Sequence, residues 1–101
     1  MDAETPITLS VDDPAVAALL PRYLERRAED LATLKDALET TLFDPVALIG
    51  HRMRGSGTAY GIPMITELGT ALEKAARCQD TDAVRAAVTQ LESFLKCVRL
   101  P

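Results

Sequence analysis

Apolar residues recur every three or four positions along most of this chain, which is the spacing of helices with one buried face. Four long stretches show the pattern, over residues 22–40, 45–59, 63–78 and 81–97. Beyond Val11, β-branched residues form no alternating run of strand length, so the pattern predicts an all-α protein. The apolar stripes of the four stretches are, in order, Leu24, Ala28, Leu31, Leu34 and Leu38; Val46, Ile49, Met53 and Gly57; Ile65, Leu68, Leu72 and Ala75; Val84, Val88, Leu91 and Leu95.

Proline and acidic residues predict where these helices begin. The pairs Asp13-Pro14 and Asp44-Pro45 each place a capping carboxylate before a proline at the first helical position. Ile62-Pro63 gives another proline start. The acidic residues at 80 and 82 can accept hydrogen bonds from the free backbone amides at the start of the last helix. Residues 15–20 predict a further short helix, which Pro21 either kinks or separates from the next one.

Short connections between the stretches favour antiparallel neighbours. The sequence therefore predicts an up-down antiparallel four-helix bundle with a short N-terminal helical appendage. Residues 13–101 are expected to form this single domain, and residues 1–12, which are polar and contain proline, a flexible lead-in.

Length and charge exclude several classes of protein. A chain of 101 residues is one domain with little room for a deep substrate cleft. Its net charge of -4 argues against nucleic acid as a partner, because phosphate backbones require a basic stripe. No apolar run reaches the roughly 18 residues of a membrane span, and we see no leader peptide. Cys78 and Cys97 are too few and too far apart for a disulfide framework or a zinc site. We expect a cytoplasmic protein, and a monomer, because no helix has a second long apolar stripe.

His51, the only histidine of the chain, lies in the middle of the second stretch. At about 100° per residue, the apolar stripe of that helix falls on the side opposite His51. The side chains predicted on the histidine's own side are small or cationic: Ala47, Arg54, Gly55 and Thr58. Glycine costs about 1 kcal/mol relative to alanine inside a helix, so Gly55 beside an outward-facing imidazole calls for a reason. The pattern alone supports a solvated surface histidine and a functional one about equally.

The segment from His51 to Gly57, His-Arg-Met-Arg-Gly-Ser-Gly, resembles the His-x-[Leu/Met]-[Lys/Arg]-Gly-[Ser/Ala] motif of histidine-containing phosphotransfer (HPt) domains. The resemblance covers roughly residues 14–97. It includes Leu68, Leu72 and Glu73, which match the family's Leu…Leu-Glu run on the following helix. It departs in Arg54, where lysine is commoner. The family's members are four-helix bundles that relay phosphoryl groups between receiver domains in two-component signalling.

The resemblance implies a role for each matching residue. His51 would accept the phosphoryl group from a receiver-domain aspartate, through a neutral imidazole. Arg54 would steady the phosphoryl oxygens, and Gly55 would keep the approach open. Glu73 would orient the imidazole, although a solvated helix carboxylate is equally compatible with its sequence context.

The same resemblance implies a phosphocarrier without kinase activity or cofactor, because the Mg²⁺ ion belongs to the partner's acidic pocket. We expect a stand-alone phosphotransfer domain whose partners are receiver domains of response regulators and hybrid histidine kinases. Two alternatives stay open: a helical adaptor that carries no phosphate, and a receiver-binding inhibitor. The residues expected to contact a receiver surround the His51 face and carry apolar or small side chains: Ala47, Leu48, Thr58, Leu19 and Leu20.

Overall fold

The computed structural model describes residues 6–9 and 11–100, and within them the chain forms four helices and two very short strands. The helices are α1 (Pro14–Thr40), α2 (Phe43–Ala59), α3 (Pro63–Arg77) and α4 (Thr81–Cys97). The strands are β1 (Ile7–Thr8) and β2 (Val98–Arg99). The prediction of an all-helical protein with four long helices is therefore confirmed.

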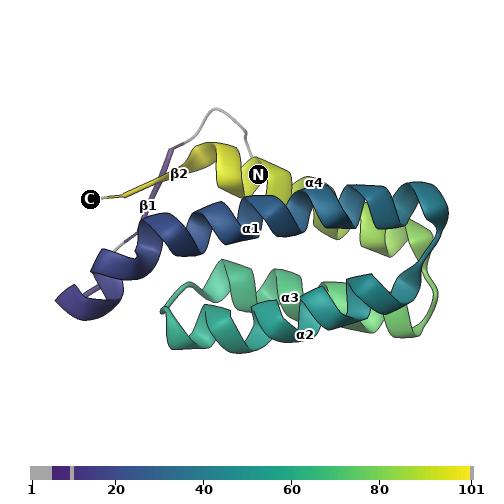
Figure 1. Ribbon diagram of the computed structural model, residues 1–101, viewed down its shortest axis with the longest axis horizontal. Helices are drawn as coiled ribbons and strands as arrows, with labels where there is room; N and C mark the ends of the chain where they lie inside the picture. The colour runs from purple at the N-terminus through teal and green to yellow at the C-terminus, as the bar shows by residue number, and fades with distance from the viewer. Residues whose placement is uncertain (1–5, 10, 101) are drawn as a thin grey trace.

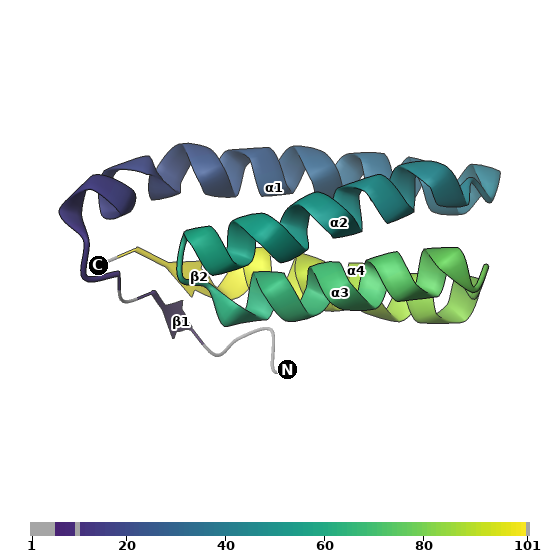
Figure 2. The same cartoon turned by 90° about the horizontal axis from the view of Figure 1, so that it is seen from below.

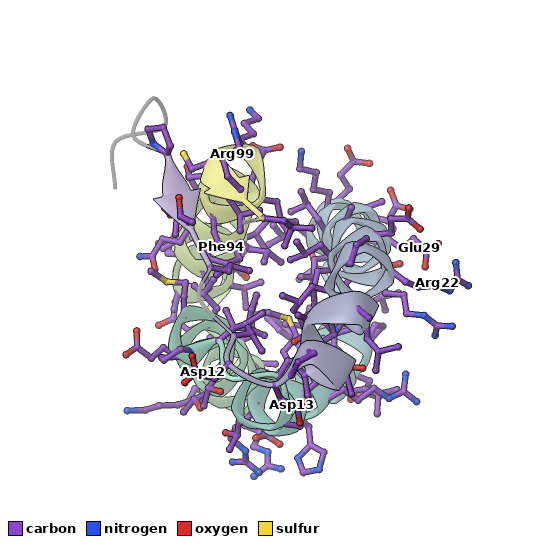
Figure 3. All side chains as sticks on the ribbon, turned by 90° about the vertical axis from the view of Figure 1, so that its left-hand side faces the viewer. Asp12, Asp13, Arg22, Glu29, Phe94 and Arg99 are labelled. Carbon is purple, nitrogen blue, oxygen red and sulfur yellow. The ribbon has the colours of Figure 1, made fainter. Side chains whose placement is uncertain are left out.

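The helices lie side by side along the long axis, and each runs opposite to the one before it (Figures 1 and 2). Helix α1 packs against α2 and α4, and α3 packs against the same two helices. Figure 3 looks along the bundle, where apolar side chains such as Phe94 fill the centre and Arg22 and Glu29 point outward from α1. None of the helices in the described part of the chain is both long and apolar enough to cross a membrane.

The helix starts follow the predicted chemistry at three of the four helices. The Asp13 carboxylate accepts a hydrogen bond from the Ala15 amide at 2.9 Å, and that of Asp80 accepts one from the Ala83 amide at 3.0 Å. Pro63 is the first residue of α3. Helix α2 differs, because it begins at Phe43 rather than Pro45 and has no side-chain cap. The half-buried Phe43 packs against the core, which explains the earlier start.

Helix α1 runs continuously through Pro21, so the short helix predicted over residues 15–20 is the first part of α1 rather than a separate element. Proline removes one helical hydrogen bond, but Leu20 and Tyr23 on either side of it are buried. Their burial holds this part of the helix against the bundle. The apolar stripe of α1 also differs from the prediction, since Ala28 is exposed whereas Tyr23 and Ala37 are buried.

The predicted stripes of α2 and α3 are buried throughout, and in α4 only Leu95 is half-buried, with the neighbouring Phe94 inside the core. These stripes could be predicted because their large apolar residues recur every three or four positions, which is the period of a helix with one buried face.

The lead-in predicted to be flexible over residues 1–12 has a defined place over residues 7–9. Strand β1 pairs in parallel with β2, with Ile7 opposite Val98 and Thr8 opposite Arg99. The Leu9 amide donates to the Arg99 carbonyl at 3.1 Å, and the Leu9 side chain is buried in the same core as the helices. For residues 7–9 the expectation of flexibility is wrong, because backbone pairing and apolar burial fix them. Residues 1–5 and 10 lie outside the described residues.

Candidate functional site

His51 lies in the middle of α2, on the side away from the core. Its side chain is 60% exposed, whereas Ile49 and Met53 on the opposite side of the helix are buried. The predicted orientation of the imidazole is thus the observed one. A partner can reach its ring without any rearrangement of the bundle.

Helices α2 and α3 approach each other closely through glycines on both sides. A Cβ atom on Gly50 would lie 2.6 Å from the Glu73 amide nitrogen and 2.7 Å from the Gly69 carbonyl oxygen. One on Gly69 would lie 2.4 Å from the Arg54 amide nitrogen. Any side chain at either position would force the two backbones apart. This contact brings Glu73 of α3 against the His51 segment of α2. A similar approach occurs at Gly57, which the sequence placed on the buried stripe and where a Cβ atom would lie 2.4 Å from the Thr66 amide nitrogen. Sequence reasoning gave no role to Gly50 or Gly69.

Glu73 is the only buried charged side chain among the residues described, with 4% of its surface exposed. Its Oε2 lies 3.1 Å from Nδ1 of His51 and 2.9 Å from Nη2 of Arg77. Its Oε1 lies 3.0 Å from Nη1 of Arg54. Leaving a carboxylate unpaired at such a depth would be costly, and the two guanidinium groups offset that cost. Glu73 is therefore not a solvated helix carboxylate.

The contacts of Nδ1 bear on which ring nitrogen of His51 carries the proton. Nδ1 lies 3.1 Å from Oε2 of Glu73 and 3.2 Å from Nη2 of Arg54, and it cannot donate to one and accept from the other at once. A carboxylate only accepts, so a proton on Nδ1 satisfies Glu73 and leaves the Nε2 lone pair free. A proton on Nε2 would deprive Oε2 of one of its two donors. The geometry favours the Nδ1–H form.

Gly55 lies one turn beyond His51 on the exposed side of α2. A Cβ atom built there would have no neighbouring atom within 4 Å beyond the helix's own backbone, so no packing reason requires glycine at this position. The space beside the imidazole is open.

Cationic side chains line an open groove of about 330 Å³ on the α3 side of the site. The groove is formed by Arg54, Thr70, Glu73, Lys74, Arg77 and Cys78. Since its only acidic member is the buried Glu73, the groove suits an anion next to His51. Among the residues that the structure describes, no three His, Cys, Asp or Glu side chains are grouped so as to hold a metal ion.

The residues predicted to contact a partner do not all reach the surface. Leu19 is 54% exposed and Leu48 is 49% exposed, while Ala47 is half-buried. Thr58 is exposed, and its hydroxyl contacts that of Thr66 at 3.3 Å. Leu20 is only 1% exposed, so its assignment to a contact surface is wrong. Successive helical residues are turned by about 100°, so the turn that exposes Leu19 points Leu20 into the core.

A polar network that sequence reasoning missed joins α1 to α2 beyond Gly55. The Tyr23 hydroxyl lies 2.8 Å from the Ser56 hydroxyl, and Arg27 donates to the same oxygen at 3.3 Å. The Tyr23 ring stacks on Tyr60 with centroids 4.1 Å apart and receives the Arg27 guanidinium on its face. Arg27 also pairs with Asp30, at 2.8 Å from Nε to Oδ2. Tyr23, the aromatic residue of α1, next to Arg22 was the available signal, but its partner Ser56 lies on another helix.

Burial raises the pKa of the Asp30 carboxyl above its ordinary value, and the nearby Arg27 only partly offsets this effect. Arg27 and Asp30 are therefore partly buried between α1 and α2 rather than fully solvated on the surface of α1.

The family model described as Hpt domain matches residues 18–99, and the chain belongs to that family. The resemblance noted over residues 14–97 is thus confirmed. No curated protein and no solved structure matches the chain. Hpt domains are phosphocarrier modules of two-component systems that interact with receiver domains, and membership indicates a phosphotransfer role for this chain.

Proposed function

We propose that His51 is the phosphoacceptor of this domain. The observation that carries the proposal is an exposed imidazole whose Nδ1 lies 3.1 Å from the buried Glu73 carboxylate. In the Nδ1–H form, Nε2 attacks the phosphorus of a receiver's aspartyl phosphate. A P–N bond forms, the P–O bond to aspartate breaks, and the aspartate leaves as a carboxylate. Attack by the aspartate of a second receiver reverses these changes and releases the neutral imidazole.

Glu73 assists this step by accepting the Nδ1 proton in a hydrogen bond. The phosphorylated ring carries a positive charge, and a carboxylate at 3.1 Å stabilises it. The Arg54 side chain, 47% exposed and on the same face of α2, can turn toward the phosphoryl oxygens and bind them. Gly55 leaves the space through which the receiver's aspartyl phosphate approaches.

The receiver's contact surface on this protein comprises Leu19, Ala47, Leu48 and Thr58, which are exposed or half-buried and belong to α1 and α2. The network of Tyr23 with Ser56 fixes α1 against α2 and so sets the position of Leu19 relative to the His51 helix. An interface of this kind is small and transient, as a relay requires.

The partners in this proposal are receiver domains of response regulators and hybrid histidine kinases. The Mg²⁺ ion that neutralises the phosphoryl group is held by the receiver, and this protein contributes a nucleophile and a docking surface. The domain acts without kinase activity of its own, as a cytoplasmic monomer.

The test is phosphate incorporation from a phosphorylated receiver domain into the wild type and into His51→Gln. Glutamine keeps a polar side chain at an exposed helical position, so stability should change by about 0.5 kcal/mol or less. An amide nitrogen is not nucleophilic, so the variant should keep its helical circular dichroism and bind the receiver without accepting phosphate.

The wild type should acquire an acid-labile, base-stable phosphate in the same experiment. Arg54→Ala should slow the transfer without abolishing it. Full phosphorylation of a folded His51→Gln sample would overturn the assignment. A wild type that binds receivers but never takes up phosphate would instead be an adaptor or an inhibitor.

A further inference from the structure

Arg77 reaches the site from the next turn of α3, and none of the roles proposed above uses it. Its Nη2 lies 2.9 Å from Oε2 of Glu73, the same oxygen that faces Nδ1 of His51 at 3.1 Å. Arg54 instead contacts the other oxygen, Oε1, at 3.0 Å. A single buried oxygen therefore links Arg77 to the imidazole.

The two arginines that hold Glu73 differ in what they can do when phosphate arrives. Arg54 lies on α2 three residues after His51, and if it binds a phosphoryl group on the imidazole, as proposed above, its guanidinium turns away from Oε1. Arg77 lies on α3 four residues after Glu73, in the spacing at which opposite charges pair along a helix. It can keep its contact throughout. A buried carboxylate that lost both cations would be strongly destabilised, so Arg77 is the cation that stays with it.

We propose that Arg77 is a positioning residue that fixes Oε2 of Glu73 so that this oxygen accepts the Nδ1 proton of His51. Arg77 touches neither the imidazole nor the reacting atoms, and its effect passes entirely through the carboxylate. The consequence is that Nε2 stays unprotonated. This inference rests on the proposed function, which gives the free Nε2 its use.

The proposal is tested by the ratio of the Nδ1–H to the Nε2–H form of His51. Nitrogen-15 shifts of the imidazole report this ratio in the full unphosphorylated chain, at a pH at which the ring is neutral. Arg77→Ala should lower the ratio by about threefold or more, as expected when a carboxylate loses the hydrogen bond that fixes it. The melting temperature should fall only slightly, because Arg54 still pairs with Oε1 of Glu73 and the Arg77 side chain is 70% exposed. Arg77→Lys should restore most of the ratio, because lysine pairs well with a glutamate four residues before it.

Lys74→Ala provides the matched control. Lys74 lines the same groove and carries the same charge, but it makes none of the three contacts of Glu73 given above. Its removal should leave the ratio at the wild-type value. The proposal is overturned if Arg77→Ala leaves the ratio unchanged, if Lys74→Ala lowers it equally, or if Arg77→Lys is as low as Arg77→Ala.

Failure of this inference is distinguishable from failure of the proposed function. The tautomer ratio is measured without any phosphate donor, so it does not depend on transfer. A wild type that accepts phosphate normally, with a ratio that ignores Arg77, removes the positioning role alone. A wild type that accepts no phosphate, with a ratio that still falls in Arg77→Ala, removes the proposed function but leaves the effect of Arg77 on the His51 tautomer in place.

Discussion

The imidazole and the carboxylate of this site have opposite surroundings, and each needs its own. His51 must be exposed for a receiver to reach Nε2, and 60% of its side chain is. Glu73 must be shielded, because a carboxylate in water would exchange its partners freely and would not hold one ring nitrogen. Its 4% exposure and two arginines meet that requirement. The hydrogen-bonding neighbours of the imidazole, Glu73 and Arg54, thus both lie at Nδ1.

Gly55→Glu tests the open space beside the imidazole. Glutamate is the better helix former at this exposed position, so the melting temperature should stay level or rise slightly. Its bulk and negative charge would oppose the incoming phosphoaspartate, so transfer from a receiver should fall by at least about tenfold. Gly55→Ala is the control, with normal transfer expected from a methyl group that contacts nothing. Wild-type transfer rates in a folded Gly55→Glu sample would show that the space has no role.

Asp30→Asn tests the half-buried carboxyl of the α1 network. Because burial raises its folded-state pKa, the folded protein holds this proton more tightly than the unfolded chain does. The Asp30 contribution to stability is therefore present at low pH and is lost as pH rises through the acid range just above the ordinary carboxyl pKa. Relative to the wild type, the melting temperature of Asp30→Asn should rise across that range. A difference that stays constant with pH would contradict the assignment.

At the scale of elements, the contact between α2 and α3 determines whether the site exists. Gly50 and Gly69 let the two backbones touch, and Glu73 reaches His51 only because they do. The sequence placed Gly55 on the exposed side and Gly57 on the buried stripe of this helix, but it gave no role to Gly50. Pairing between helices depends on the fold as a whole, so Gly69 carried no local signal.

Gly50→Ala should separate α2 from α3. The added methyl would lie 2.6 and 2.7 Å from backbone atoms, which cannot rotate away as side chains can. We expect a loss of about 1–3 kcal/mol in stability, the usual cost of overpacking, measured by denaturant unfolding. The His51 tautomer ratio should also move away from Nδ1–H. Gly55→Ala on the same helix should instead gain up to about 1 kcal/mol. Equal effects from both alanines would show that helix propensity, not the close approach, governs this helix.

At the scale of the whole molecule, the sequence predicted the helices and the outward orientation of His51 better than it predicted the contacts between distant segments. The stripes of α2 and α3 repeat locally, and His51 stood out by its orientation and its motif. The pairing of Ile7 with Val98 joins the two ends of the chain, so neither segment reveals it alone. The hydrogen bond between Tyr23 and Ser56 was missed for the same reason. Arg77 was missed although it lies only four residues after Glu73, because the burial of Glu73 depends on the contact of α3 with α2. Residue 77 reads as an ordinary surface arginine until Glu73 is known to be buried.

The docking surface can be tested by truncating exposed leucines on it and comparing them with a buried leucine and with an exposed one outside it. Leu19→Ala and Leu48→Ala should each weaken receiver binding by about fivefold while leaving the melting temperature almost unchanged, because both side chains are about half exposed. Leu20→Ala should do the opposite and cost about 2–5 kcal/mol of stability, as large core truncations do. Leu42, 55% exposed in the connection between α1 and α2, provides an equally apolar control. That connection lies at the opposite end of the bundle from the start of α1 (Figure 1). Leu42→Ala should bind the receiver normally. If Leu42→Ala weakened binding as much as Leu19→Ala, or if amide shifts on receiver addition clustered on α4, the receiver would dock elsewhere than over His51.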